Sequence, residues 1–436
     1  MADTSRYDNA ARQLKLASQA LDSGRLGPVR RLVNTLAPAE IGNLLESLPP
    51  EKRLMVWGLV DPEDDGEVLV HVGDEVRESL IRDMDAEELV AAAETLDVDD
   101  LADLMEDLPD HLVDEVLRSM DRENRERLEQ VLAYPEDTAG RLMNPEVVTV
   151  RADVSVDVVL RYLRMREELP ENTDHVYVVS RRHQYLGRLA LATLITTNPE
   201  RAVNELIDDR QPALRATDAV EAVAKEFADH DWVSAPVVDE NNILLGRITI
   251  DDVVDIIREQ AEHQALGAAG LDEDEGLLSP VRRATRRRAL WLGVNLLTAF
   301  AAASVVLVFL NAIQEIKWLA VFMPVIAGMG GNAGTQALAV SIRRIALGQV
   351  APGREAGIVG KEMLVGLSVG LVAALMAGGI GWIVDGPRFG AVVAFAMTAN
   401  LGVAGFAGAF VPLLLGRLKI DPAIASSVFV TTFTDM

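Results

Sequence analysis

The sequence contains no cysteine and only six histidines. The absence of cysteine excludes a disulfide framework and a thiolate metal site. The histidines are scattered, and neither a Ser-His-Asp arrangement nor a P-loop occurs, so we do not expect an enzyme. Basic residues are also few, because 41 Lys and Arg stand against 67 Asp and Glu, for a formal charge of −26 at pH 7. No nucleic-acid partner is expected.

The shortage of basic residues is confined to residues 1 to 279, which hold 28 Lys and Arg against 61 Asp and Glu, a formal charge of −33. This acidic part should attract cations. Residues 280 to 436 hold 13 Lys and Arg against 6 Asp and Glu, a formal charge of +7. They also contain five apolar runs of roughly the ~20 residues that a helix needs to cross a bilayer, which a soluble core does not explain. The runs are Leu290 to Leu310, Trp318 to Ile342, Gly357 to Val384, Phe389 to Leu415 and Ile420 onward.

Basic residues in short loops stay in the cytosol. Basic residues precede the first run, separate the second from the third, and separate the fourth from the fifth. The N-terminus is therefore expected to be cytosolic and the chain's end to face outward. The membrane is expected to be the cytoplasmic membrane. Residues 1 to 30 have no apolar run, and no cleavable signal peptide is expected. The last run has 17 residues, Ile420 to Met436, which indicates a truncated or a short fifth helix.

Residues 1 to 140 have an all-helical, weakly repetitive pattern. AEIGNLLESLPPEKR at Ala39 recurs approximately as DDLADLMEDLPDHLV at Asp99, which is typical of a solenoid of paired helices. Asp85 followed by Glu88 fits a capped helix start. Residues 141 to 200 and 201 to 258 instead form two similar units in which short β-branched strands alternate with helices.

The second of these units resembles the second half of a cystathionine-β-synthase-type (CBS) regulatory pair, on the segment AVEAVAKEFADHDWVSAPVVDENNILLGRITIDDVVDII. In such modules G-h-h-T-x-x-D is associated with nucleotide binding, and Gly246, Thr249 and Asp252 match it. The first unit, GRLALAT at Gly187, lacks the Thr and the Asp at the matching places. The resemblance makes ATP a candidate regulatory ligand, with a dimerisation module that binds nothing as the alternative.

An acidic helix follows, and residues 259 to 280 are expected to connect the CBS pair to the membrane. A solvated helix face is one explanation of its carboxylates. The other is a divalent cation that relieves their mutual repulsion near the membrane. The carboxylates are those of Asp251, Asp252, Asp255, Glu259 and Glu262.

Two segments of the membrane part carry polar groups. In PVIAGMGGNAGTQALAVSIRR, Asn332 and Gln336 place amides on one helix face, which favours either contact between helices or a pore lining. In DPAIASSVFVTTFTDM, Asp421 fits a helix cap, whereas Asp435 lies ~20 Å into the run, at ~1.5 Å per residue. An ionisable group at that depth is a functional candidate, either protonated or bound to a cation.

A two-fold dimer would bring two copies of Asp435 together. With Asn332, and with the hydroxyls of Thr431 or Thr432, such a site suits a partly hydrated Mg²⁺.

The order of these features, with YPEDTAGRLM at Tyr134 between the repeats and the CBS pair, resembles the MgtE family of bacterial magnesium channels over essentially the whole chain. The resemblance implies a homodimer with five membrane helices per subunit, a pore at the dimer interface with Asp435 as its aspartate, and closure when cytosolic Mg²⁺ binds between the N domain, the CBS pair and the connecting "plug" helix. Asp252 and Asp255 match regulatory ligand positions. Further regulatory candidates are Asp99, Asp100, Asp103, Asp251, Glu259, Glu262 and Asp421.

The predicted fold is therefore a multidomain membrane protein with an all-α helical-repeat N domain, an α/β tandem CBS pair, a connecting helix and a five-helix transmembrane domain over 281 to 436. Its predicted function is Mg²⁺ import closed by cytosolic Mg²⁺. Two alternatives stay open at this point: transport of another divalent cation such as Co²⁺ or Mn²⁺, and a nucleotide-sensing membrane regulator without transport.

Overall fold

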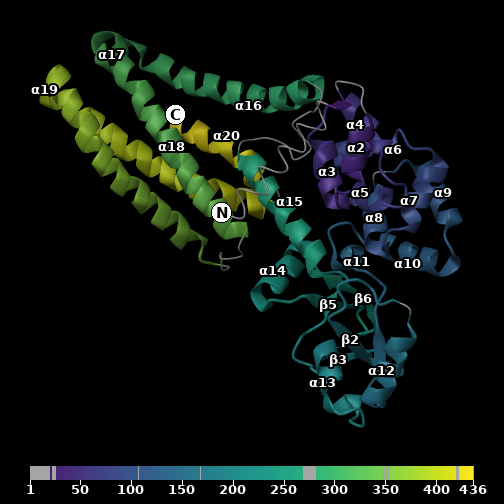
Figure 1. Ribbon diagram of the computed structural model, residues 1–436. Coiled ribbons are helices and arrows are strands. Elements are labelled where there is room, and N and C mark those ends of the chain that lie inside the picture. Colours follow the sequence, from purple (N-terminus) through teal and green to yellow (C-terminus); the bar gives the residue numbers. More distant parts are fainter. Residues whose placement is uncertain are drawn as a thin grey trace. The chain divides into compact units, whose positions relative to one another are not determined.

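A computed structural model describes residues 20–21, 26–106, 108–166, 168–268, 281–346, 350, 353–418 and 422–435 (Figure 1). The chain divides into two compact units, Met1–Arg258 and Glu259–Met436. Each has its own buried apolar clusters.

The first unit begins with short helices in which alternate members pack together, α3 on α5, α5 on α7 and α7 on α9. This stacking confirms a helical repeat. Asp85 caps α7 as predicted, since its carboxylate accepts from the Glu88 backbone N–H at 2.9 Å and its own N–H donates to Glu88 at 3.0 Å. The helices are α2 (Leu26–Val33), α3 (Pro38–Glu46), α4 (Pro50–Trp57), α5 (Asp65–Val70), α6 (Asp74–Ile81), α7 (Ala86–Glu94), α8 (Val98–Glu106), α9 (Asp110–Ser119), α10 (Arg122–Leu132) and α11 (Ala139–Leu142).

Two arginines that donate to backbone carbonyls show the repeating unit directly. Arg53 is 4% exposed and donates to the carbonyls of Leu45 and Leu48 at 3.0 and 3.3 Å. Arg77, 24 residues further on, makes the same pair of bonds to the equivalent carbonyls at 2.9 and 3.1 Å. The structural repeat is therefore one helix pair, which is shorter than the spacing between the two similar sequence segments at Ala39 and Asp99.

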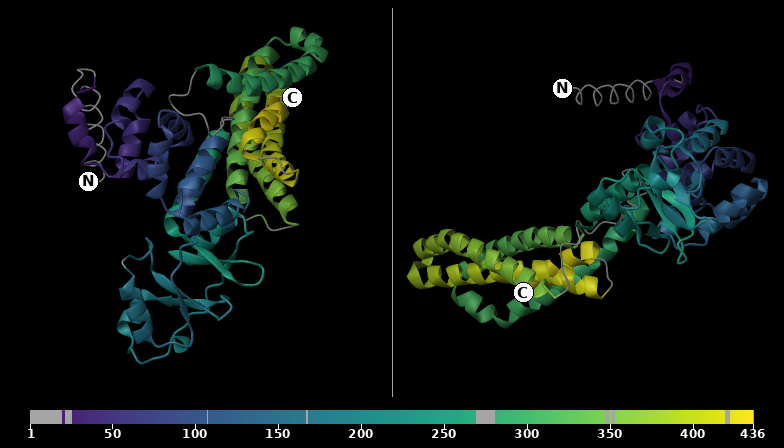
Figure 2. Two further views of the ribbon diagram at one scale, coloured as in Figure 1. Left: turned by 90° about the vertical axis from the view of Figure 1, so that its right-hand side faces the viewer. Right: turned by 90° about the horizontal axis from the view of Figure 1, so that it is seen from below.

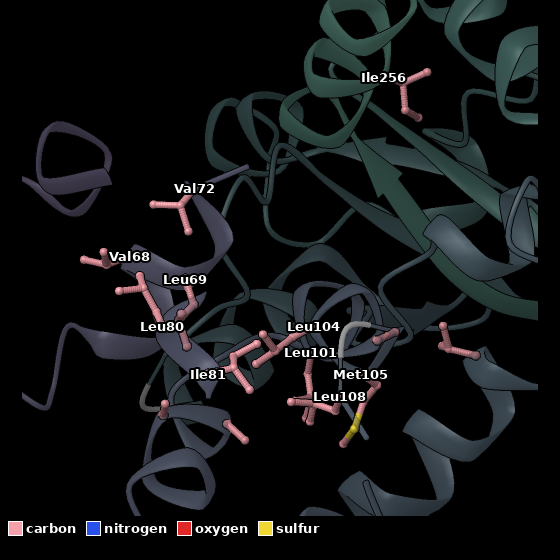
Figure 3. Close-up of a cluster of buried hydrophobic side chains, with 14 of the residues drawn as sticks. Val68, Leu69, Val72, Leu80, Ile81, Leu101, Leu104, Met105, Leu108 and Ile256 are labelled. Carbon is pink, nitrogen blue, oxygen red and sulfur yellow. The ribbon is translucent and has the colours of Figure 1, made fainter. Parts of the chain in front are cut away.

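Leucine-rich faces of these helices meet in one core (Figure 3). Leu69 of α5, Leu80 of α6 and Leu101 of α8 are at most 2% exposed. The same cluster includes residues of the second CBS unit, among them Phe227, Val237 and Ile248. The N domain and that unit are thus packed together through apolar burial, at about 25 cal/mol for each Å² removed from water.

The two CBS units repeat one sheet topology. In each sheet the first strand pairs parallel with the second, and the second pairs antiparallel with the third, with a register shift at the same place. The first unit has β1 (Thr149–Arg151), α12 (Val156–Met165), β2 (His175–Val179), β3 (Tyr185–Ala190) and α13 (Leu191–Thr196). The second has β4 (Leu214–Arg215), α14 (Val220–His230), β5 (Ser234–Val238) and β6 (Leu244–Thr249), after a 3₁₀ turn at Val203–Glu205.

The segment before the first strand of each unit pairs with the third strand of the other unit. Asn144 bridges Arg247, and Asp208 bridges Arg188, each in antiparallel fashion. Helix α15 (Ile250–Ala268) follows β6 directly and runs without a break past Arg258. The CBS pair and the helix that leaves it are therefore continuous in secondary structure.

The second unit is helical, with α16 (Val281–Val308), α17 (Leu310–Glu315), α18 (Trp318–Ala346), α19 (Glu355–Arg417) and α20 (Pro422–Asp435). Helix α19 breaks at Asp385 and Gly386, where the backbone leaves the helical region, and so forms two arms. Helices α18, α19 and α20 lie side by side in all views (Figure 2). Within the described residues, Ala284–Val308 and Glu355–Arg417 are long and apolar enough to cross a membrane. Many large apolar side chains on these helices are exposed, Ile383 by 87% and Leu375 by 79%.

Candidate metal sites

Asn144 lies at the junction of the N domain and the second CBS unit. Its backbone pairs with Arg247 in both directions, at 2.8 and 2.9 Å. Its side-chain amide donates to Asp97 at 3.1 Å and to Asp99 at 3.2 Å. One residue therefore joins the end of β6 to the acidic start of α8, and this link was not predicted from sequence.

The predicted aspartates of α8 and α15 come together at this junction. Asp99 and Asp100 occupy the first turn of α8, and Asp251 and Asp252 occupy the first turn of α15. Both are helix N-termini, where the macrodipole favours negative charge. The sequence gives the carboxylates of each helix, and only the fold brings the two helices together.

The electrostatics of the junction reflect this crowding. Burial, then the charges of Asp252, Asp100 and Asp97, raise the pKa of Asp99 well above its usual range. Burial, then neighbouring carboxylates headed by Glu67, raise the pKa of Asp100 to about 7. Burial and Asp251 raise the pKa of Asp252 to about 8. Desolvation and like charges both disfavour ionised carboxylates, so the junction favours either protons or a bound cation.

Glu67 of α5 is a further member of the junction that sequence reasoning missed. Burial raises its pKa above the usual range, with Glu171 and Asp97 adding to the effect. In the part of the chain that the structure describes, no three carboxylate or histidine groups are yet close enough to hold a metal ion. A bound cation would therefore draw these side chains inward.

The nucleotide-associated motif lies in the same place. The Thr249 hydroxyl donates to the carboxylates of Asp251 and Asp252, the latter at 3.2 Å. Gly246 lies against Asn144, because an added Cβ would come within 2.7 Å of the Asn144 carbonyl oxygen. The glycine therefore has a packing role here, and the threonine and aspartates are already hydrogen-bonded to one another.

The other predicted regulatory residues lie further from the junction's interior. Asp103 is exposed on α8, although its charge contributes to the raised pKa of Asp100. Asp255, Glu259 and Glu262 are exposed along α15. Asp421 lies outside the described residues.

In the second unit, helix α18 has two different faces around its glycine-rich segment. Gly330 and Gly334 are buried against Asn400 and Val430. Among the described residues, a Cβ added at Gly328 or Gly331 would meet no atom within 4 Å, and Asn332, Thr335 and Gln336 are exposed. The polar face is thus the one that the described residues leave uncovered.

Helix α20 has a comparable division. Val430 is fully buried and Thr434 is 4% exposed, so this face packs inward. Asp435 is exposed, and Thr431 and Thr432 are half-buried. The predicted pore residues are therefore placed at exposed or partly exposed positions on α18 and α20.

Sequence reasoning missed two polar residues of this unit. Asn400, in the second arm of α19, donates to the Ile326 carbonyl at 2.7 Å. Glu362, in the first arm, is 6% exposed and lies 3.8 Å from a terminal nitrogen of Arg344. Polar groups inside apolar runs were the signal that would have found both.

Comparison with known families matches three parts of the chain. Residues 323–436 match the family described as "Divalent cation transporter", residues 36–137 match the "MgtE intracellular N domain", and residues 203–259 match the "CBS domain". These matches cover the N domain, the second CBS unit and the helices from the glycine-rich segment of α18 onward.

Curated relatives resemble the chain over most of its length. The magnesium transporter MgtE of Thermus thermophilus is 31% identical over 425 residues, covering 96% of this chain and 94% of the relative. That of Bacillus subtilis is 28% identical over 417 residues, covering 95% and 92%.

Two solved structures resemble the N domain and the CBS pair. The cytosolic domain of the Mg²⁺ channel MgtE in complex with ATP aligns with a TM-score of 0.51 at 32% identity, over 55% of this chain and 98% of that one. The soluble part of a magnesium transporter aligns with a TM-score of 0.50 at 23% identity, over 58% and 99%, a likeness of fold.

Proposed function

Because the chain belongs to the MgtE family, whose members are magnesium transporters and not enzymes, we propose that it conducts Mg²⁺ into the cell across the cytoplasmic membrane. In this proposal α16, α18, the two arms of α19 and α20 are five membrane spans. The N-terminus is cytosolic and the chain's end faces outward, as the positions of the basic residues favour.

The observation that carries the proposal is the uncovered polar face of α18 and α20. Asn332, Gln336 and Asp435 are exposed on helices that are otherwise apolar. Polar and ionisable groups are too costly to face lipid, so they require water or a protein partner. A second copy of the chain, related by a two-fold axis, is the protein partner, and a path between the two copies holds the water.

Asp435 is the proposed ion ligand in that path, with Asn332, Thr431 and Thr432 as further oxygen donors. Mg²⁺ prefers oxygen ligands and keeps several of its waters, so a wide site with two symmetry-related carboxylates suits it. Mg²⁺ is here the transported substrate.

We propose that the junction of α8 and α15 senses cytosolic Mg²⁺. Without a cation, Asp99, Asp100 and Asp252 oppose one another at close range. A divalent cation neutralises them and draws the carboxylates of the N domain and of the CBS pair together, and this compact state closes the path. Asp251, Asp255, Glu259 and Glu262 on α15, with Asp103 and Asp421, are further candidates for the same ions.

ATP is a proposed regulatory ligand, supported by the ATP complex of the similar cytosolic domain. Thr249 and Asp252 belong both to the nucleotide-associated motif and to the acidic junction. Nucleotide binding would therefore change the affinity for Mg²⁺ at this site, and Mg²⁺ binding would change the affinity for nucleotide by the same factor.

Radiotracer or fluorescence measurement of Mg²⁺ uptake in cells tests the transport proposal. Asp435→Asn removes the proposed ligand charge and should abolish most of the uptake. Asp385→Asn is the matched control, because Asp385 is also exposed in the helical unit but lies at the break of α19. Equal uptake by the two variants would contradict the assignment, and the same assay with Co²⁺ and Mn²⁺ measures selectivity.

A further inference from the structure

A glycine and an asparagine make a very close approach between α18 and the second arm of α19. A Cβ added to Gly330 would lie 2.4 Å from Asn400 Nδ2, and the three nearest atoms all belong to Asn400. The Asn400 amide also donates to the Ile326 carbonyl at 2.7 Å. The asparagine side chain thus occupies the space that any other residue at position 330 would fill.

The hydrogen bond is made to a carbonyl that already has a helical role. In an α-helix the Ile326 carbonyl accepts from the N–H four residues later, which is that of Gly330. A carbonyl oxygen has two lone pairs, so it can accept from Asn400 as well. Because lipid offers no competing donor, such a bond between helices is retained within an apolar bundle.

This contact lies behind the exposed polar face of α18. Residues 330 and 332 are two positions apart and so point about 200° apart around a helix with 3.6 residues per turn. Gly330 is buried on Asn400, whereas Asn332 is exposed. The rotation of α18 that places Gly330 against Asn400 is therefore the rotation that presents Asn332 outward.

We propose that Asn400 is a positioning residue, whose bond to Ile326 and fit against Gly330 set the rotation at which α18 presents Asn332 to the ion path. Asn400 itself touches no ion. The inference rests on the proposed function, because it gives Asn332 a place in the path.

The absence of cysteine from the chain makes a direct test practicable. Asn332→Cys introduces a single thiol, and a membrane-impermeant cationic methanethiosulfonate measures how fast that position is reached from water in the full-length protein. Asn400→Leu keeps the side-chain size but removes the donor, and should change the modification rate at least about fivefold, in line with the loss of one hydrogen bond. Asn295→Leu, at an exposed asparagine of α16, is the matched control and should leave the rate unchanged.

A second pair of variants tests the contact itself. Gly330→Ala alone should also change the rate, because its methyl group collides with Asn400. Asn400→Ala vacates that space, so the double variant should be less affected than the sum of the two single variants. Additive effects, or a rate that neither single substitution changes, would overturn the positioning role.

The same variants separate this inference from the proposed function. If Asn332→Cys is unreactive in every background, the proposal that Asn332 lines a water-filled path is wrong. The contact is then tested by thermal unfolding. Non-additive changes in the unfolding midpoint for Gly330→Ala and Asn400→Ala would support the contact between α18 and α19, and additive changes would overturn it.

Discussion

The side-chain amide of Asn144 donates to the carboxylate of Asp99 at 3.2 Å, which links the start of the CBS pair to the first turn of α8. The backbone of Asn144 is fixed on Arg247, two residues before Thr249. An uncharged donor therefore holds the N-domain carboxylates beside those of α15. Among the described residues, the charged groups that most affect the pKa values of Asp99, Asp100 and Asp252 are other carboxylates, and no basic side chain is one of them. This arrangement leaves the balancing charge to a proton or a mobile cation.

Substitution of Asn144 should weaken the response to Mg²⁺. Asn144→Ala removes two hydrogen bonds to carboxylates, and bonds to charged groups contribute about 1.5–3 kcal/mol each. We expect Asn144→Ala to lower the Mg²⁺ affinity of the cytosolic sites at least tenfold, measured by calorimetry on the full-length protein. Asn241→Ala, in the exposed loop before β6, is the control, and equal affinities for the two variants would show that Asn144 does not organise the junction.

Mg²⁺ binding should be coupled to proton release. Asp100 and Asp252, with pKa values of about 7 and about 8, are partly protonated in the folded protein at neutral pH. Mg²⁺ competes with these protons, so its affinity should rise from pH 6 to pH 8. Calorimetry in two buffers of different ionisation enthalpy counts the protons released. An affinity that does not depend on pH, with no proton release, would contradict the proposed site.

The same raised pKa values predict how stability depends on pH when Mg²⁺ is absent. Between about pH 4 and pH 8 the folded junction binds more protons than the unfolded chain, so the free energy of unfolding falls as pH rises. Thermal unfolding in a chelating buffer should show a lower midpoint at pH 8 than at pH 6. Added Mg²⁺ should remove most of that difference, and a midpoint that rises with pH would have the wrong sign.

The arginines that bond to backbone carbonyls in the helical repeat should be important for stability. Arg53→Ala removes two hydrogen bonds from a charged donor to buried carbonyls, at about 1.5–3 kcal/mol for each bond. Arg82→Ala removes only an exposed ion pair with Glu78, which is typically about 0–1 kcal/mol. Thermal unfolding should show a clear loss for Arg53→Ala and little change for Arg82→Ala. Similar midpoints for the two variants would mean that the carbonyl contacts are not stabilising.

Features with local causes were predictable from the sequence. The Asp85 and Glu88 cap needs only a spacing of three residues, and the change from helical repeats to CBS-like strands follows from local composition. The carboxylates of α8 and α15 were likewise visible as clusters on single helices.

Features that depend on partners distant in the sequence could not be predicted from it. Nothing in the sequence pairs Asn144 with Asp99, which lie 45 residues apart, or Asn400 with Ile326, 74 residues apart. The contributions of Glu67 and Asp97 to the junction also arise only when α5, α8 and α15 meet. The hydrophobic pattern showed weak repetition but not the length of the repeating helix pair. That length is seen in the arginine bonds to backbone carbonyls, which a hydrophobic pattern does not record.

Closure of the ion path by Mg²⁺ at the acidic junction can be measured by recording Mg²⁺ conductance while Mg²⁺ on the side of the soluble domains is raised from zero to millimolar. The comparison is between the natural chain and a variant carrying Asp99→Asn, Asp100→Asn and Asp252→Asn, with Asp114→Asn, an exposed aspartate of α9, as the charge control. We expect the natural chain and the control to lose conductance as Mg²⁺ rises, whereas the conductance of the triple variant should no longer respond. An unchanged Mg²⁺ response in the triple variant would contradict closure by Mg²⁺ at the junction.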